Sequence, residues 1–306
     1  MFRHVCFQWT TRQNEELRGP TWDCLFVTER CGTFRFDQVP KTVKINKLPG
    51  VESLCRKDKL CRNYKKMRTK FGAGHFNFLP DTFNIPEELE LLKGEEYEDV
   101  AFILKPPAQS CGNGIKIVTD LNTIPSRSKG LVVQRYLTNP FLIDGLKFDL
   151  RLYLLITGVN PLKMFLYNDG LVRFATRFFT MNPAFLADSF RHLTNYSVNK
   201  YNPDFEHNED PSKFSGHKRS YKALLKYLAE NTYDVERLER NIRDVIIKTV
   251  MISYDEIVKE FQTKVKSDYN CYKLFGVDII LDETLKPWLL ELNNFPSLGK
   301  AENFLH

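Results

Sequence analysis

The chain has 306 residues, of which 42% are hydrophobic and 27% are charged, and its formal net charge is +6 at pH 7. This length and apolar content support a sizeable core divided among two or three small lobes, and the spread of charge excludes a long disordered tail. No apolar run reaches membrane-spanning length, and residues 1–6 lack the apolar segment of a secretory signal. Seven cysteines without paired metal-ligand spacing complete the expectation of a reduced, soluble cytosolic protein.

The first strong pattern is a basic run over residues 56–70, in which Asp58 is the only acid. The spacing of Leu60, Tyr64 and Met67 predicts a helix with one apolar face. The basic residues either form a solvated helix face or dock a polyanion, and nucleic acid and an acidic polypeptide tail both fit. Charge alone does not choose between these alternatives.

Strands and turns dominate the middle of the chain. Apolar runs predict strands at residues 100–104, 115–118 and 130–137, with Lys105-Pro106-Pro107 ending the first and Gly112-Asn113-Gly114 turning into the second. Longer β-segments are expected at residues 148–157, 163–167 and 171–175, the last two joined by a turn at Asn168-Asp169-Gly170.

The last third of the sequence favours helices followed by a hairpin. Helices are expected at residues 220–229 and from 235 past 257, the second marked by Leu238, Ile242, Val245 and Thr249. Two nearly apolar strands at residues 274–281 and 285–292 then form a buried hairpin around Asp282-Glu283-Thr284.

Acids inside this apolar hairpin indicate a metal site, because an unpaired buried carboxylate is costly. Glu291 and Asn293 share one face of their strand, and folding the hairpin brings Asp278 nearly opposite them. Three oxygen ligands without sulfur or imidazole suit Mg²⁺. A buried polar cluster bonded to the backbone or to an arginine is the alternative.

A magnesium ion of this kind usually serves a nucleoside triphosphate, although the P-loop and protein-kinase signatures are absent. Lys105 ends a strand and precedes a loop of small residues whose backbone N–H groups suit phosphate oxygens. Lys147, Asp149 and Arg151 share one face of a strand, and residues 134–137 offer a backbone edge for adenine.

Seven ordered motifs resemble those of the tubulin–tyrosine ligase-like family, from about residue 34 to residue 298. They are Lys105-Pro106-Pro107, Gln134-Arg135-Tyr136-Leu137, Lys147-Phe148-Asp149-Leu150-Arg151, Asp169-Gly170-Leu171-Val172-Arg173-Phe174, His192-Leu193-Thr194-Asn195-Tyr196-Ser197, Phe275-Gly276-Val277-Asp278 and Glu291-Leu292-Asn293.

The resemblance implies an α/β (α+β) fold of the ATP-grasp type, with the nucleotide site between a central and a C-terminal lobe. The corresponding division is an N-terminal lobe at residues 1–70, a central lobe at 71–140 and a larger C-terminal lobe at 141–306. It implies ATP and Mg²⁺ as cofactors, with Mg²⁺ on Asp278, Glu291 and Asn293. The residues it implies for ATP are Lys105, Cys111, Gly112, Gln134, Arg135, Tyr136, Leu137, Lys147, Asp149, Thr194 and Asn195.

Within the family, Tyr196-Ser197 resembles the glutamylating version of its motif, in members that attach the first branch glutamate. The resemblance implies that Arg173, Tyr196, Ser197 and Lys218 hold the incoming free L-glutamate. The implied partner is tubulin or another acidic protein tail, with no nucleic acid, no membrane and a monomeric enzyme. Its expected location is the cytoplasm and the microtubule cytoskeleton, cilia or basal bodies included. Cys111 stands where close relatives carry an arginine, which bears on substrate contact or rate.

The implied reaction joins a glutamate to a side-chain carboxylate that ATP has activated as an acyl phosphate. Arg151 is the candidate catalytic residue, because a guanidinium matches the geometry of the phosphate oxygens. A glycine or tyrosine ligase of the same family is one alternative, which a pocket with two cations for two carboxylates disfavours. A catalytically silent module that binds acidic tails through residues 56–70 is the other.

Overall fold

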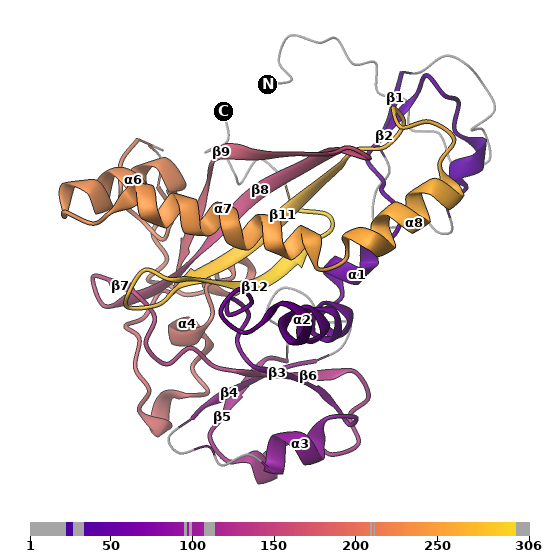
Figure 1. Cartoon of the computed structure of the whole chain (residues 1–306). Helices are drawn as coiled ribbons and strands as arrows, with labels where there is room; N and C mark the ends of the chain where they lie inside the picture. Colours follow the sequence, from indigo (N-terminus) through magenta and orange to yellow (C-terminus); the bar gives the residue numbers. More distant parts are fainter. Residues whose placement is uncertain are drawn as a thin grey trace.

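The computed structural model describes residues 23–26, 34–94, 97, 100–106, 114–208, 210 and 212–297. A larger sheet has the strand order β10-β9-β8-β11-β12, with β7 paired to β8, and a four-stranded sheet has the order β3-β6-β4-β5. Helix α2 lies between the two sheets, and the short β1-β2 pair lies at the far end of the larger one (Figure 1). This mixture of helices and antiparallel sheets agrees with the expected fold class.

The structure describes the following elements. The strands are β1 (Cys24–Leu25), β2 (Lys44–Ile45), β3 (Thr82–Ile85), β4 (Phe102–Lys105), β5 (Lys116–Val118), β6 (Leu131–Arg135), β7 (Leu142–Ile143), β8 (Leu146–Val159), β9 (Leu162–Phe174), β10 (Lys218–Ser220), β11 (Lys273–Leu281) and β12 (Pro287–Asn293). The helices are α1 (Glu52–Cys55), α2 (Lys57–Phe71), α3 (Leu89–Gly94), α4 (Ser189–His192), α5 (Tyr196–Asn199), α6 (Tyr221–Glu230), α7 (Val235–Met251) and α8 (Tyr254–Lys264), with short 3-10 turns at Phe36–Gln38, Leu121–Thr123 and Pro183–Phe185.

Strands β8 and β9 form one long hairpin that turns at Asn160 and Pro161. The prediction of a turn at Asn168-Asp169-Gly170 is wrong, because these residues lie inside β9. A Cβ atom on Gly170 would lie 2.6 Å from the backbone oxygen of Arg151. The glycine therefore permits a close approach of two strands where the sequence indicated a turn.

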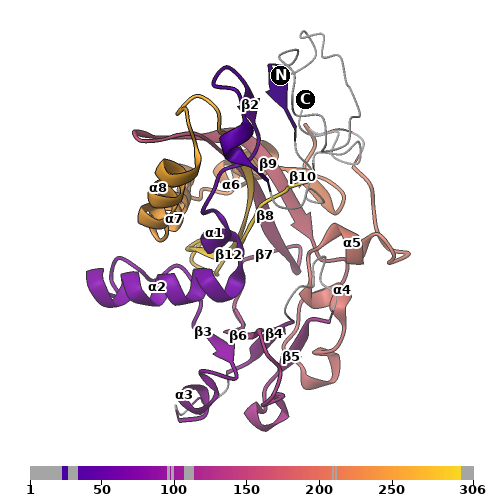
Figure 2. The same cartoon turned by 90° about the vertical axis from the view of Figure 1, so that its right-hand side faces the viewer.

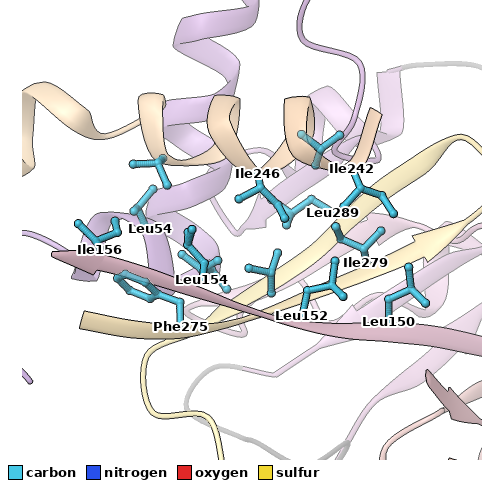
Figure 3. Packing of buried hydrophobic residues seen from close by; sticks show 14 of the residues in the cluster. Leu54, Leu150, Leu152, Leu154, Ile156, Ile242, Ile246, Phe275, Ile279 and Leu289 are labelled. Carbon is cyan, nitrogen blue, oxygen red and sulfur yellow. The ribbon is translucent and has the colours of Figure 1, made fainter. Parts of the chain in front are cut away.

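The larger sheet has one apolar face, and α7 covers it. Leu150, Leu152 and Leu154 of β8 point toward Ile242 and Ile246 of α7 (Figure 3), and all five side chains are buried. Burial of each such side chain contributes about 1.5–3 kcal/mol to folding. Figure 2 shows α7 and α8 on this side of the sheet and α4 and α5 on the other. The second face is thereby left for polar side chains.

The helix expected to run from residue 235 past 257 is two helices, α7 and α8, so its expected extent is wrong. The chain leaves the helical path at Ile252 and Ser253, without a proline or glycine. Helix α8 then packs so closely on the segment before α1 that a Cβ on Gly50 would lie 2.9 Å from the Ile257 Cα. The boundary between α7 and α8 thus depends on tertiary packing, which the hydrophobic periodicity of the sequence does not reveal.

The four-stranded sheet and α2 follow the sequence expectations more closely. Strands β4, β5 and β6 confirm the three expected strands, with shifts of a few residues at their ends. Leu60 and Tyr64 of α2 are buried and Met67 packs against the same core, which confirms the expected apolar face. Among the helices that the structure describes, none is long and apolar enough to cross a membrane.

Candidate active site

Charged residues line the face of the larger sheet that α7 does not cover. Lys218 of β10 lies opposite Arg173 of β9, which lies opposite Asp149 of β8. One row further along, Arg151 of β8 lies opposite Asp278 of β11, which lies opposite Glu291 of β12. Because side chains alternate along a strand, these residues share one face while Leu150 and Leu152 share the other. The alternation of charged and apolar residues along these strands thus gives the sheet one polar face and one face that packs on the core.

Two arginines hold Asp278 at the centre of this face. Arg151 bonds both carboxylate oxygens, through Nε and Nη2, and Arg173 Nη2 bonds Oδ2 at 2.9 Å. Arg173 also bonds Asp149, with its Nε 2.7 Å from Oδ1. Burial on its own raises the pKa of Asp278, but Arg173 and Arg151 outweigh it and bring that pKa to about 2. Asp278 is therefore an anion at every physiological pH.

The sheet register brings the three expected metal ligands together. Asp278 and Glu291 are direct partners across the hairpin, and Asn293 Nδ2 lies 3.3 Å from Asp278 Oδ2. Two carboxylates and an amide oxygen suit Mg²⁺, which usually keeps several waters or phosphate oxygens. Over the residues that the structure describes, no group of three His, Cys, Asp or Glu side chains forms a metal site. The candidate set thus fits Mg²⁺ only with the amide included.

Lys57, at the start of α2, reaches one of these carboxylates, that of Glu291, a contact that sequence reasoning missed. Its Nζ lies 3.1 Å from Glu291 Oε2, and the two side chains are 32% and 28% exposed. The sequence placed Lys57 within a uniform basic run and gave no sign that it differs from its neighbours. Only the packing of α2 beside the hairpin separates it from the other cations.

Two lysines from different sheets flank the carboxylates: Lys147 is buried and Lys105 is half-buried. Lys105 Nζ, on β4, donates to Gln134 Oε1 at 2.6 Å. Burial lowers the pKa of Lys105 to about 8, against the charges of Glu291 and Asp278, which raise it. Burial likewise lowers the pKa of Lys147 to about 7, and the charge of Lys105 adds to that decrease. The four-stranded and larger sheets therefore contribute cations to one site.

The remaining residues expected near the nucleotide divide into three groups. Cys111 and Gly112 lie outside the described residues. Gln134 is buried on β6, and the backbone N–H groups of Arg135 and Tyr136 donate to Asp81 and Ala101 oxygens. An adenine contact from this segment would therefore involve carbonyl groups or Leu137. Thr194 and Asn195 connect α4 and α5, where Thr194 is buried.

The residues expected to hold glutamate meet beside β10. Lys218 Nζ lies 5.4 Å from the centroid of the Tyr196 ring, in the first turn of α5. Ser197 follows Tyr196 in the same turn. Arg173 lies opposite Lys218, but its guanidinium is bound to two carboxylates. Lys218 and Arg173 thus form the cationic end of the row that includes Asp149, and Arg173 links this row to Asp278 in the next one.

Gly276 has a part in the site that the sequence did not reveal. A Cβ at this position would lie 2.9 Å from Arg151 Cδ and 3.0 Å from Pro296 Cβ. The glycine in Phe275-Gly276-Val277-Asp278 thus leaves room for the Arg151 side chain to cross β11 and reach Asp278. Sequence reasoning weighed the acid of this motif but not its glycine.

The helices and antiparallel sheets form a mixed helix-and-sheet fold that agrees with an ATP-grasp-like fold. The model of the tubulin-tyrosine ligase family matches residues 36–305, and the chain belongs to that family. It is 41% identical over 86% of its length to "Tubulin monoglutamylase TTLL4" of Mus musculus. It is also 41% identical over 84% of its length to "Probable beta-tubulin polyglutamylase" of Tetrahymena thermophila. To "Tubulin polyglutamylase TTLL7" of Xenopus tropicalis it is 36% identical over 96% of its length.

The family assignment confirms the resemblance inferred from the seven motifs. The chain spans 22%, 22% and 33% of the lengths of these three relatives. What their names say about tubulin and glutamate describes those longer proteins.

Proposed function

We propose that this chain is an ATP-dependent ligase that adds glutamate to glutamate side chains of tubulin or another acidic protein tail. The observation that carries the proposal is the pairing of Asp278 with Glu291 across the hairpin, with Asn293 beside them and Lys105 and Lys147 nearby. Family membership and the names of the relatives support the choice of tubulin and glutamate. A glycine or tyrosine ligase remains the second candidate within the family.

The site residues take the following roles in this proposal. Asp278, Glu291 and Asn293 hold Mg²⁺, while Lys105 and Lys147 neutralise phosphate oxygens and Arg151 steadies the activated acceptor. ATP supplies the phosphoryl group that turns the acceptor carboxylate into an acyl phosphate, with ADP as the other product. The glutamate amine then attacks the acyl carbon, and inorganic phosphate leaves as the amide bond forms. The protein's contribution is mainly positioning and charge neutralisation. The nucleotide lies between the four-stranded sheet and the larger sheet, which are the central and C-terminal lobes of a monomer.

Lys218 is the residue that best tests the choice of amino acid. We expect Lys218→Ala to lower kcat/KM for glutamate by about 30-fold or more, since loss of a desolvated charge partner costs about 2–5 kcal/mol. The KM for ATP should stay within about twofold, because Lys218 lies on β10 and Glu291 on β12, at opposite ends of the strand order of the larger sheet. Labelled glutamate, glycine and tyrosine should compete for one tubulin acceptor in the wild type and the variant.

Lys222→Ala is the matched control, because Lys222 is exposed on α6 four residues further along the chain. Preferential use of glycine or tyrosine by the wild type would contradict the glutamylase proposal and leave the ligase. An unchanged glutamate kcat/KM in Lys218→Ala would remove only Lys218 from the pocket.

The basic face of α2 offers a docking surface for an acidic tail. Lys65 is engaged with Glu88 at 2.7 Å and Arg68 with Asp81 at 3.1 Å. Arg62, Lys66 and Lys70 are exposed and recur every four residues, so they share one side of the helix. A row of exposed cations attracts a polyanion through long-range electrostatics that salt weakens.

Reversing Arg62 and Lys66 together to glutamate should raise the KM for tubulin by roughly tenfold at low salt, and by less at higher salt. The KM for free glutamate and for ATP should not change. The control is the double reversal of Arg237 and Arg240, two exposed arginines of α7 that give the same change in net charge. Equal tubulin kinetics in both double variants would show that residues 56–70 are an ordinary solvated face.

The same proposal places the protein in the cytoplasm on the microtubule cytoskeleton, cilia or basal bodies included, because the acceptor is found there. A silent binding module is disfavoured by the site itself. Such a module would not require Asp278, Glu291 and Asn293 together with Lys105 and Lys147 at one place.

A further inference from the structure

The ammonium group of Lys147 lies in a small cage on the nucleotide side of the larger sheet. Its Nζ donates to the Tyr136 hydroxyl at 2.8 Å and to the His192 backbone oxygen at 2.9 Å. The same nitrogen lies 4.4 Å from the centroid of the Tyr136 ring and 5.9 Å from that of Phe179. Lys147, Tyr136 and His192 are all buried, with exposed fractions of 6%, 5% and 2%. Two of the three ammonium protons therefore have defined acceptors.

The direction of the hydrogen bonds in this cage follows from His192. Its Nε2 lies 3.1 Å from the backbone oxygen of Phe185, and a carbonyl oxygen only accepts, so Nε2 carries the proton. Burial, helped by the charge of Lys147, lowers the pKa of His192 and keeps the ring neutral. Nδ1 is then an acceptor, and the Tyr136 hydroxyl, 3.0 Å away, donates to it.

This direction leaves the oxygen lone pairs of Tyr136 facing Lys147. The chain runs from the Lys147 ammonium to the Tyr136 oxygen, from the Tyr136 hydroxyl to His192 Nδ1, and from His192 Nε2 to Phe185. A neutral amine could also donate to both oxygens, but hydrogen bonds from an ionised donor are roughly twice as strong, so these two acceptors stabilise the ammonium more than the amine. The cage thus favours the charged lysine that burial disfavours.

We infer that Tyr136 and His192 are positioning residues that hold the Lys147 ammonium charged and turned so that its third N–H meets a phosphate oxygen. This inference rests on the proposed nucleotide site and assigns the Tyr136 side chain a part separate from any adenine contact of its backbone. The other charged groups that act on Lys147 are Asp149 on β8 and Lys105 on β4. Asp149 is already bound to Arg173, and Lys105 is a second cation for the same anion.

Calorimetric titration of ATP with Mg²⁺, without glutamate or acceptor, tests the inference by affinity alone. Tyr136→Phe keeps the ring and removes one oxygen, and we expect the Kd at pH 8 to rise roughly 10- to 100-fold, as for loss of a hydrogen bond to a charged group. Tyr254→Phe is the matched control, since it loses a hydroxyl bond to the Val159 oxygen, at 2.9 Å, outside the site. Its Kd should equal that of the wild type.

The pH dependence separates positioning of a charge from simple packing. The pKa of Lys147 is already lowered to about 7, so its charged form is lost as pH rises through that value. Without the Tyr136 oxygen this loss begins at lower pH, so the ratio of variant to wild-type Kd should grow from pH 6 to pH 8. Titration of ATP and of Lys105 is common to both proteins and cancels in the ratio.

Variants of His192 provide an independent arm. His192→Asn puts an amide oxygen near the place of Nδ1, so it should keep the Tyr136 acceptor and bind ATP better than His192→Leu. A ratio of Kd values that is the same at every pH, or an unchanged Kd in folded Tyr136→Phe, would overturn the inference. Absence of ATP binding by the wild type would overturn the proposed nucleotide site as well.

Discussion

Glu291→Gln should abolish glutamate incorporation while the protein stays folded. Glu291 is the direct partner of Asp278 across the closing hairpin, and glutamine keeps its size but removes the charge that Mg²⁺ requires. We expect a loss on the order of 100-fold or more, since changes even to the partners of metal ligands cost about 10–100-fold. Incorporation of labelled glutamate into tubulin at saturating ATP and Mg²⁺ measures the effect.

The stability of this variant should change little. The only ion pair that the described residues give to Glu291 is the one to Lys57, and it is part-exposed, so its loss costs about 1 kcal/mol or less. Glu283→Gln, in the exposed turn of the same hairpin, is the matched control and should keep the wild-type rate. A Glu291→Gln enzyme with most of the wild-type rate would exclude Glu291 from the metal site.

Arg173→Ala should destabilise the fold by about 3–5 kcal/mol, because it leaves Asp149 and Asp278 buried without their shared cation. Urea unfolding at neutral pH measures this loss. Arg177→Ala, four residues further on, removes a part-exposed pair with Asp188 and should cost about 1 kcal/mol or less. Equal losses in the two variants would show that the Arg173 network contributes no more than a surface ion pair.

Lowering the pH should reduce the difference in unfolding free energy between Arg173→Ala and the wild type. The pKa of Asp278 is lowered in the folded protein to about 2, so its stabilising effect is present above the ordinary carboxylate pKa and is lost as pH falls toward 2. Without Arg173 that pKa rises, and protonation relieves the unpaired charge at higher pH. The difference in unfolding free energy should therefore be largest above about pH 5 and shrink as the pH is lowered toward 3.

This result also changes how the glutamate pocket is tested. An inactive Arg173→Ala protein would report on folding as much as on recognition of the substrate. Lys218 is the more informative position, because it lies on the edge strand β10, at the end of the row that it forms with Arg173 and Asp149. The sequence alone ranked the two residues as equivalent clamps.

Local patterns predicted the parts of the fold whose physics is local. Alternation along two apolar strands placed Asp278 nearly opposite Glu291 and Asn293, and helical spacing placed Leu60 and Tyr64 on one apolar face. The prediction of a turn at Asp169-Gly170 was wrong. A glycine can mark a residue with positive φ or a place where a side chain would not fit, and only the close approach of Arg151 from β8 shows that the second applies here.

The side-chain partners in the site could not be predicted in the same way. Arg173 and Asp278 are separated by 105 positions and meet only because β8 lies between their strands. Lys57 approaches Glu291 because α2 packs beside the hairpin. Such contacts depend on strand order and register over the whole sheet, and these follow from global packing.

The two faces of the larger sheet also suggest how the proposed ligase can be re-engineered. Positions 150, 152 and 154 meet α7, so library members altered there would be removed mainly by misfolding. Positions 196, 197 and 218 lie on the opposite face, near the edge strand β10, away from the hydrophobic contacts of α7. Directed evolution of a ligase for other amino acids should therefore saturate these three codons first and keep codon 173 fixed.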